Sequence, residues 1–304
     1  MQCKIIQEDC EKFLKRKLSY KFDMTFLDPP FNQNKYYASH NDNLHHSEYW
    51  DWMKRISKLI YKHTSKGGAI YFMQRERNTQ YVLDTLVSSG WTFQNLIIWK
   101  KKTSAIPSQI RFGKHYQIIA FATKGKTPRV FNRLRINPPL LVTEKYSRPK
   151  GRYLTDIWDD IRELTSGYFA GEEPFRLDNG ERIHKQQSPV QLLLRIILSS
   201  TIKEDMVFDP FAGTGTTLVV AKQLQRKSLG IEIDPPNVSL IEDRISYLRD
   251  IDDIQVYRND YKFTENLDNI FPFQEKKKRF GFKPTKQESE HQMLFSLEDK
   301  TENK

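Results

Sequence analysis

Residues 206–224 read MVFDPFAGTGTTLVVAKQL, and this stretch decides the expected fold. It opens with an apolar run typical of a short strand ending at Asp209, and it closes with the composition of a buried helix. Between them, Gly213 and Gly215 let the backbone approach a ligand closely, because glycine has no Cβ. A Walker loop is excluded, since no Gly-Lys-Ser/Thr follows, and Leu218 stands where a dinucleotide fingerprint has its third glycine.

An acidic residue follows the glycine loop about 20 residues later, at the end of the next expected strand. This residue, Glu232, can hold ribose hydroxyls, as the corresponding acid does in nicotinamide enzymes. The Asp-Pro-Phe sequence at residues 209–211 fits an adenosyl amino acid better, with Asp209 near its charged methionine end. The alternative interpretation is a glycine-rich turn with no ligand.

Strand-like and helix-like runs alternate along the chain. Helices are expected to begin near Ser47, after Asn78 and at the pair Ser188-Pro189. This alternation predicts an α/β fold, with a doubly wound, mostly parallel sheet and helices on both faces. The fourth and fifth expected strands have no helix between them, so we expect them to pair antiparallel at an edge. The expected strands are Lys4–Gln7, Asp23–Leu27, Ala69–Met73, Trp91–Trp99, Gln117–Ala122, Met206–Asp209 and Leu229–Ile233.

A second motif, Asp-Pro-Pro-Phe at residues 28–31, directly follows an apolar run. The amino group of adenine is a poor nucleophile because its lone pair is delocalised into the ring. Asp28 and the carbonyl group of Pro29 can accept its two N–H bonds, which leaves the lone pair facing a methyl donor. Pro29 and Pro30 would fix that carbonyl group, and Phe31 would stack on a base swung out of the duplex. The alternative is a strand that ends in a proline turn.

Two similar tetrapeptides are interpreted as turns. Residues 137–140 read NPPL, which lacks the aromatic ring and does not follow an apolar strand. Residues 234–237 read DPPN and do follow an expected strand, but they also have no ring to stack on a base.

The chain of 304 residues carries a net charge of +11, which favours a polyanionic partner. Many of its cations lie between the two motifs, in a basic segment with Tyr146, Tyr153 and Trp158 interleaved. We expect this segment to contact double-stranded DNA, mostly at phosphates, although a charge run can also be a solvated face. Its expected contact residues are Arg129, Arg133, Arg135, Lys145, Arg148, Lys150 and Arg152.

The only two cysteines, Cys3 and Cys10, predict neither a disulfide framework nor a zinc site. The N-terminus has no secretory h-region. The longest apolar helix candidate, Val190–Leu198, is interrupted by Arg195 and is too short to span a bilayer. We therefore expect a reduced, cytoplasmic protein that does not contact a membrane.

Taken together, the two motifs resemble those of the amino-group DNA methyltransferases. The catalytic motif comes first and the glycine loop last, and this permuted order resembles the β class, which is common in restriction–modification systems. The resemblance covers about residues 4–250 and implies a Rossmann-like methyltransferase fold, S-adenosyl-L-methionine as cofactor and an inserted target-recognition region. The parts expected on this basis are a catalytic half (1–123), the target-recognition region (124–181), a cofactor-binding half (182–258) and a charged tail (259–304).

Shorter matches extend this resemblance. Residues 7–10, QEDC, resemble an acidic motif that contacts the cofactor adenine, and residues 184–189, HKQQSP, resemble a His-x-x-Gln-Lys-Pro motif with Ser in place of Lys. Residues 99–100 and 111–115 resemble the strand pair near the target base, which adds Lys100 and Arg111 to the expected DNA contacts. The residues expected at the cofactor are Asp9, Cys10, His184, Gln187, Ser188, Asp209, Phe211, Gly213, Gly215, Thr216, Thr217 and Glu232.

The expected acceptor is adenine N6, because the adenine enzymes of this family usually begin the catalytic motif with Asp and the cytosine-N4 enzymes with Ser. Methyl would pass in line to a flipped base, without a metal, because the sulfonium is already activated. Three alternatives stay open: a cytosine-N4 methyltransferase, an RNA or protein-glutamine methyltransferase, and an inactive DNA-binding homologue. The resemblance also allows a homodimer and a separate restriction endonuclease as partners.

Overall fold

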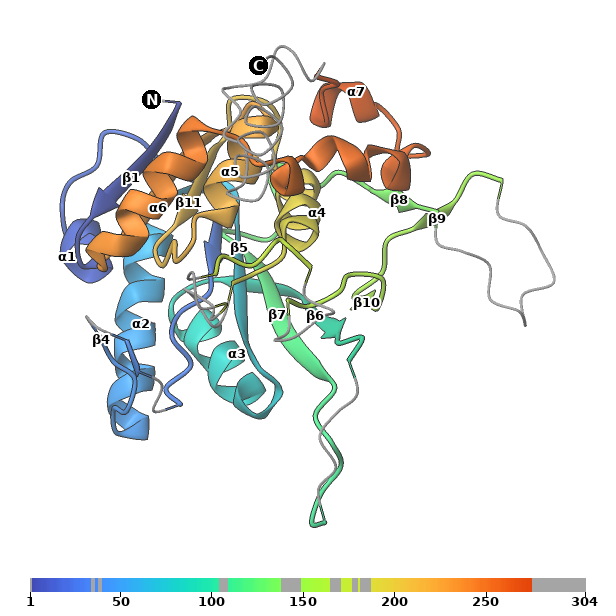
Figure 1. Ribbon diagram of the computed structural model, residues 1–304. Coiled ribbons are helices and arrows are strands. Elements are labelled where there is room, and N and C mark those ends of the chain that lie inside the picture. The colour runs from blue at the N-terminus through green and yellow to red at the C-terminus, as the bar shows by residue number, and fades with distance from the viewer. Residues whose placement is uncertain are drawn as a thin grey trace, which may run out of the picture.

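The computed structural model describes residues 2–33, 36–37, 40–103, 109–137, 149–164, 171–176, 180 and 187–274 (Figure 1). In this part of the chain an eight-stranded sheet forms the centre of the molecule. In spatial order its strands are β1 (Cys3–Gln7), β12 (Lys227–Glu232), β11 (Met206–Asp209), β2 (Phe22–Leu27), β5 (Thr64–Arg75), β7 (Tyr116–Thr123), β6 (Thr92–Lys100) and β10 (Ile157–Trp158). The strands from β1 to β5 in this order are parallel.

The structure confirms the α/β fold and every strand expected from the sequence. The largest departure is β5, which begins at Thr64 rather than at Ala69. The expected antiparallel pairing of β6 with β7 is confirmed, and β7 is also antiparallel to β5. The short strand β10 pairs in parallel with β6 and lies outside it, at the edge of the sheet.

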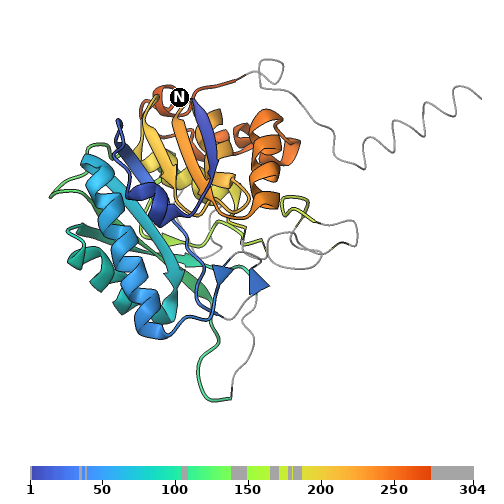
Figure 2. The same cartoon turned by 90° about the vertical axis from the view of Figure 1, so that its left-hand side faces the viewer.

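Helices cover both faces of the sheet because the buried strands carry apolar side chains on both sides. Along β5, Ile70 and Phe72 point to one hydrophobic cluster, while Tyr71 and Met73 point to the other. The first cluster is completed by α1 (Cys10–Leu14), α2 (His46–His63) and α3 (Thr79–Ser88), and Figure 2 shows α2 in light blue on the near side of the molecule. The second is completed by α4 (Val190–Ser200) and α5 (Thr216–Gln223).

Two helices begin close to the expected positions but with different caps. α2 begins at His46, before Ser47, because the Glu48 side chain accepts the N–H of His45 at 3.3 Å. α4 begins at Val190 with Pro189 as its N-cap, one residue later than expected. A carboxylate supplied from outside the helix, that of Glu173, accepts the N–H of Val190 at 2.7 Å.

One of the two expected proline turns is a helix start instead. Asp234 is the N-cap of α6 (Pro235–Ser246), and Pro235 is its first residue, so the interpretation of residues 234–237 as a turn is wrong. The physical reason is that proline has a φ suited to the first helical turn and lacks only an N–H that would be unpaired there. In the other tetrapeptide, residues 138–140 lie outside the described part of the chain.

The basic segment is built onto the core rather than set apart from it. β8 (Arg135–Ile136) and β9 (Arg152–Tyr153) form an antiparallel ribbon, while β10 joins the main sheet. Buried residues Leu134, Ile136 and Ile161 extend the second hydrophobic cluster into this segment.

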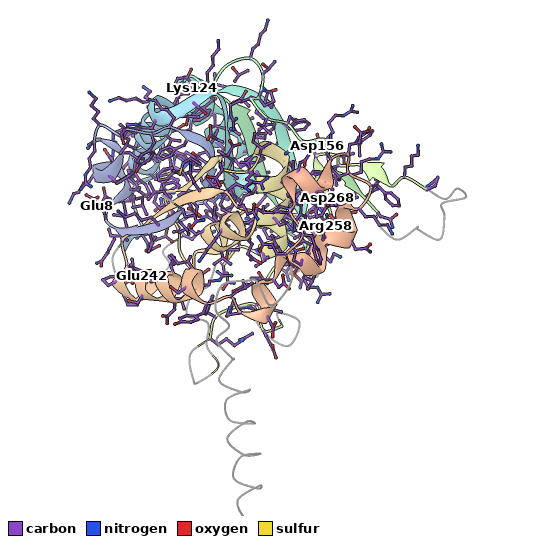
Figure 3. The ribbon with its side chains drawn as sticks, turned by 90° about the horizontal axis from the view of Figure 1, so that it is seen from above. Glu8, Lys124, Asp156, Glu242, Arg258 and Asp268 are labelled. Carbon is purple, nitrogen blue, oxygen red and sulfur yellow. The ribbon has the colours of Figure 1, made fainter. Side chains whose placement is uncertain are left out.

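The first part of the expected C-terminal tail also packs on the core. Tyr261 closes the 3₁₀ helix η4 (Ile254–Tyr261), and Phe271 follows α7 (Leu267–Ile270); both side chains are fully buried. Figure 3 shows Arg258 beside Asp268, an ion pair that joins η4 to α7. Among the described residues, no helix is both long enough and apolar enough to cross a membrane.

Candidate active site

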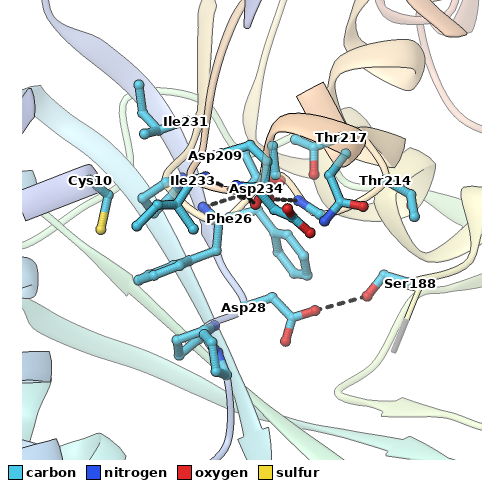
Figure 4. Close-up of a pocket in the computed structure, with 18 of the residues that line it drawn as sticks. Cys10, Phe26, Asp28, Ser188, Asp209, Thr214, Thr217, Ile231, Ile233 and Asp234 are labelled. Atoms are coloured by element: carbon cyan, nitrogen blue, oxygen red, sulfur yellow. Dashed lines mark hydrogen bonds between the residues drawn. The ribbon is translucent and has the colours of Figure 1, made fainter. Parts of the chain in front are cut away.

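Acidic side chains gather where the parallel strands end. Asp28 directly follows β2, Asp209 is the last residue of β11, Glu232 is the last residue of β12, and Asp9 follows β1 as the N-cap of α1. Since these strands run in the same direction, their carboxyl ends meet at one edge, where open α/β sheets bind ligands. Figure 4 shows Asp28 and Asp209, from neighbouring strands, at the same cavity.

The glycine loop between β11 and α5 is held in one conformation. Gly215 has a φ of 77°, and a Cβ atom there would lie 2.9 Å from Ile241, so both the backbone and the space require glycine. The N–H of Gly213 donates to Glu232 Oε2 at 2.8 Å. The two residues after Glu232 donate their N–H groups to its Oε1 at 3.0 and 2.9 Å. Glu232 therefore ties the loop to the end of β12.

Arg244 of α6 supports the same loop and was not anticipated from the sequence. It is buried, and it donates to the Thr214 carbonyl oxygen at 2.8 Å and to the Thr216 hydroxyl at 3.0 Å. It also binds both oxygens of Asp252, which pairs with Arg249 as well. Burial alone would raise the pKa of Asp252, but the two guanidinium groups lower it to about 2. The loop thus rests on a buried ionic cluster.

A cavity opens between the glycine loop, the end of β12 and the Asp-Pro-Pro-Phe loop, and we call it the glycine-loop cavity. Burial raises the pKa of Asp209 to about 7, although Thr217 and the N–H of Phe211 donate to it. Burial also raises the pKa of Glu232. The walls of the glycine-loop cavity combine acidic with apolar side chains, including Asp9, Phe26, Asp28, Trp52, Asp209, Phe211, Glu232 and Ile233.

The acidic and apolar side chains of the glycine-loop cavity match the groups of an adenosyl amino acid. A buried carboxylate is stabilised by a cation or by hydrogen-bond donors. The ammonium and sulfonium groups of such a ligand supply positive charge, its ribose supplies hydroxyl donors, and its adenine suits apolar walls. Asp209, Glu232 and the rings of Phe26, Trp52 and Phe211 therefore fit S-adenosylmethionine.

A second cavity, of about 290 Å³, lies on the other side of Asp28, and we call it the aromatic cavity. Phe31 and Trp99, which are 5% and 3% exposed, supply flat apolar surface. Trp99 Nε1 donates to the Ile161 carbonyl oxygen at 3.0 Å, which fixes the indole ring. The polar side chains in its wall are Lys101, Thr103, Gln117 and Glu163, together with those shared with the glycine-loop cavity. Aromatic walls with a few polar groups suit a planar heterocycle.

Asp28, Gln187 and Ser188 line both cavities, so they stand at the junction between them. Ser188 Oγ donates to Asp28 Oδ2 at 3.1 Å, as the dashed line in Figure 4 shows. This contact holds the carboxylate of Asp28 between the two cavities. A group bound in one cavity can therefore react with a group bound in the other, beside Asp28.

The loop that carries Asp28 is fixed from its far side. Asn32 has a φ of 52°, and its side chain exchanges two hydrogen bonds of 2.8 Å with the backbone of Leu44. Buried Asp42 accepts the N–H of Asn32 at 2.7 Å and that of the next residue at 3.0 Å. Tyr49 donates its hydroxyl to the Pro30 carbonyl oxygen at 2.8 Å. Such contacts pre-organise the Asp-Pro-Pro-Phe loop before any ligand binds.

The structure brings most of the residues expected at the cofactor to one place. Gly215 stands in the loop without lining the cavity, and His184 lies outside the described residues. Gln187 donates to the Glu173 carbonyl oxygen and accepts from the N–H of Phe175, so its amide holds residues 173–175. The expected residues that line the glycine-loop cavity are Asp9, Cys10, Gln187, Ser188, Asp209, Phe211, Gly213, Thr216, Thr217 and Glu232.

The expected DNA-contact residues divide into separate groups. Arg129 pairs with Asp23 and Asp205, at the amino ends of β2 and β11, on the opposite edge of the sheet from Asp28. Arg133 and Arg135 both place their guanidinium groups against the ring of Tyr153. Arg129 is exposed despite these ion pairs, as are Lys100, Arg111, Arg133 and Lys150. Arg135 and Arg152 are half-buried, and Lys145 and Arg148 lie outside the described residues.

Several side chains of the site carried no recognisable signal in the sequence. Trp52 reads as one more apolar residue of an amphipathic helix, yet it lines the glycine-loop cavity and meets Phe211 edge-on at 5.6 Å. Lys101 and Gln117 read as polar residues at strand ends, and Glu163 reads as one acid in a segment without periodicity. Only the antiparallel register of β6 with β7 places the first two together, with Lys100 opposite Tyr116.

Known DNA methylases resemble this chain over most of its length. A family model described as DNA methylase (N6_N4_Mtase) matches residues 22–243. The type II methyltransferase M1.MboII of Moraxella bovis is 27% identical over 259 residues, which cover 78% of this chain and 94% of that protein. The DNA adenine methyltransferase YhdJ of Escherichia coli (strain K12) is 27% identical over 253 residues, covering 78% of this chain and 80% of that one.

Solved structures share the fold. The M1.HpyAVI–SAM complex superposes with a TM-score of 0.51 at 23% identity, covering 79% of this chain and 98% of that one. The cytosine-N4-specific PvuII DNA methyltransferase superposes with a TM-score of 0.59 at 18% identity, covering 79% of this chain and 85% of that one. At these identities the likeness concerns the architecture of sheet and helices.

Proposed function

The chain belongs to the N6/N4 family of DNA methylases, and from this premise we propose that it methylates the N6 amino group of adenine in double-stranded DNA. It is a DNA methyltransferase with S-adenosyl-L-methionine as its cofactor. The choice of adenine is supported by Asp28 at the head of the Asp-Pro-Pro-Phe motif and by the relative YhdJ, whose name is that of an adenine methyltransferase.

Asp28 lies where the glycine-loop cavity meets the aromatic cavity, and this position is the main support for methyl transfer to a base. We assign the cofactor to the glycine-loop cavity and a flipped adenine to the aromatic cavity. Asp28 and the Pro29 carbonyl oxygen accept the two N–H bonds of the adenine amino group. The nitrogen lone pair is then turned out of conjugation and directed toward the glycine-loop cavity.

The cofactor supplies a methyl group on a positively charged sulfonium, which needs no further activation. The carboxylates of Asp209 and Glu232 would balance the positive charge of the bound cofactor and accept hydrogen bonds from its hydroxyl groups. These interactions would stabilise both carboxylates in their ionised form, against the effect of burial on their pKa values. After transfer the N6 nitrogen carries a positive charge, and the negative charge of Asp28 stabilises it until one of the N6 protons passes to solvent water. Phe31 packs against the base and excludes water from the reacting atoms.

We propose that DNA lies along the edge that carries Asp28. Lys100 ends β6 at this edge, and residues 109–115, which lead into β7, form a segment that projects from the body of the protein (Figure 1). Arg111 and Phe112, in this segment, are exposed. The β8–β9 ribbon adds Arg135 and Arg152, and Arg133 and Lys150 lie two residues before them. The same basic segment holds Lys145 and Arg148. Most of these cations would bind phosphates. We do not include Arg129 in this surface, because its guanidinium group forms ion pairs with Asp23 and Asp205.

The base assignment is tested by nucleoside mass spectrometry. Unmethylated DNA is incubated with the protein and isotopically labelled S-adenosylmethionine, digested to nucleosides and analysed for labelled methyl groups. We expect labelled N6-methyladenine and no labelled N4-methylcytosine. Labelled N4-methylcytosine alone would contradict the adenine assignment, and label confined to added RNA or protein would contradict DNA as the substrate.

A further inference from the structure

Lys101 is the one basic side chain in the wall of the aromatic cavity, as far as the described residues show. It follows the last residue of β6, and its N–H donates to the His115 carbonyl oxygen at 2.8 Å, which holds the backbone at the edge of the sheet. Its Nζ lies 3.3 Å from the centroid of the Trp99 ring. The ammonium group is therefore positioned by both the backbone and the aromatic wall.

The hydrogen bonds around Lys101 leave donors for a ligand. A lysine ammonium group has three N–H donors. Within the described residues, the hydrogen bond that Nζ makes goes to Gln117 Oε1. Glu163, an acid in the same cavity wall, accepts instead from the backbone N–H of Lys102 at 2.8 Å and from that of Thr103 at 2.9 Å. A ligand in the aromatic cavity that carries a hydrogen-bond acceptor can therefore bind the donors of Nζ that Gln117 does not use.

The pKa of Lys101 agrees with its position in the wall of the aromatic cavity. Burial lowers the pKa of Lys101 to about 7, even though Glu163 and Asp28 act in the opposite direction. The cavity therefore holds a lysine that is charged in part of the molecules near neutral pH and that donates hydrogen bonds in either state. An acceptor without its own proton would stabilise the charged form.

The proposed function specifies what such an acceptor is. When Asp28 accepts from the amino group of a flipped base, the rest of the ring extends into the aromatic cavity. The exocyclic amino group of adenine is flanked by two ring nitrogens, N1 and N7, and both are acceptors. Lys101 lines the same cavity as Asp28, so one of these nitrogens comes within its reach.

We propose that Lys101 reads the flipped base by donating a hydrogen bond from Nζ to the ring nitrogen beside the amino group that receives the methyl. This assignment rests on the proposed function and deepens it. The contact selects a base with an acceptor next to its amino group, and it sets the rotation of the ring so that the amino group meets Asp28. Gln117 acts as a positioning residue, because it orients Nζ from the neighbouring strand β7.

The test uses the full-length protein and a duplex oligonucleotide that carries its methylation site, mapped beforehand. The variant Lys101→Met keeps the length and apolar stem of the side chain but removes its donors. Lys58→Met is the matched control, because Lys58 is exposed on α2. Lys101 does not line the glycine-loop cavity, so Lys101→Met should bind S-adenosylmethionine with unchanged affinity, which also shows that the variant is folded.

The single-turnover methylation rate is then measured with adenine, 1-deazaadenine or 7-deazaadenine at the target position. With the wild-type protein we expect one of the analogues to slow methylation by about 10- to 100-fold, the loss typical of a hydrogen bond to a charged group. Lys101→Met should methylate adenine more slowly than the wild-type protein by a similar factor. Replacing adenine with that analogue should not slow the variant any further. Lys58→Met should behave as the wild type does.

Two results would overturn the assignment of Lys101. One is a Lys101→Met protein that methylates adenine at the wild-type rate. The other is a Lys101→Met protein whose methylation rate falls, when the analogue replaces adenine, by the same factor as the rate of the wild-type protein. Such a result would mean that Lys101 and the ring nitrogen act independently, because the effects of independent changes multiply. A wild-type protein that methylates no base in DNA would overturn the proposed function itself, and the Lys101 assignment with it. These outcomes are distinguishable within one set of reactions.

Discussion

Lowering the pH from 7.5 to 6 is expected to weaken cofactor binding by about eightfold through protonation of Asp209. Asp209 is the last residue of β11, and burial raises its pKa to about 7 in the free protein. We place this carboxylate next to the positively charged methionine end of the cofactor, so only its ionised form binds the cofactor well. Binding is therefore strong above the pKa of Asp209 and is lost as the pH falls through it.

The magnitude follows from that pKa. With a pKa of about 7, roughly three quarters of Asp209 is ionised at pH 7.5 and about a tenth at pH 6, and the ratio of these fractions is about eight. Calorimetric titration with S-adenosylmethionine at constant ionic strength measures the ratio directly. At the upper pH of 7.5 an α-amino group such as that of the cofactor, with a pKa of about 7.7 to 8.0, is still mostly protonated.

Variants separate Asp209 from other groups that titrate in this range. Asp209→Asn should bind the cofactor weakly at both pH values, with little dependence on pH. Asp51→Asn removes an acid that is exposed on α2, and it should keep the wild-type ratio. An affinity that does not change between the two pH values, or an unaltered ratio in Asp209→Asn, would refute the assignment of Asp209.

Three further predictions concern other parts of the site. Ser188→Ala removes the donor to Asp28 Oδ2 and should lower kcat by about fivefold in steady-state kinetics. Phe112, which is 99% exposed on the projecting loop, is expected to stack on DNA, so Phe112→Ala should weaken DNA binding by about tenfold in fluorescence anisotropy. Arg244→Met leaves the buried carboxylate of Asp252 with Arg249 alone, and urea unfolding should show a loss of about 3 kcal/mol.

The sequence suffices for the parts of the site that depend on strand ends. Asp28, Asp209 and Glu232 each end an apolar run, and parallel strands place their ends at one edge regardless of the details of packing. The glycine loop is recognisable for a similar reason, because glycine readily adopts the φ of 77° at residue 215 and has no Cβ to collide with Ile241. Such features depend on local chemistry and on the direction of the strands.

Features that depend on contacts between distant segments were not accessible in the same way. Ser188 resembles part of a cofactor motif, but its hydroxyl reaches Asp28, which is 160 residues away in the chain. Arg244 reads as a polar residue of an amphipathic helix, and only packing shows that it is buried under the glycine loop. Charge density likewise made Arg129 a candidate for DNA, whereas the fold pairs it with acids at the far edge of the sheet.

We propose that Asp28, at the junction of the two cavities, accepts a hydrogen bond from the adenine amino group during methyl transfer. The most direct measurement is the amount of N6-methyladenine formed in a single turnover by wild-type protein and by Asp28→Ala, each saturated with S-adenosylmethionine and DNA. We predict a rate at least about 100-fold lower for Asp28→Ala, the effect expected when the group that stabilises developing charge is removed. An Asp28→Ala protein that forms N6-methyladenine at the wild-type rate would contradict this role of Asp28.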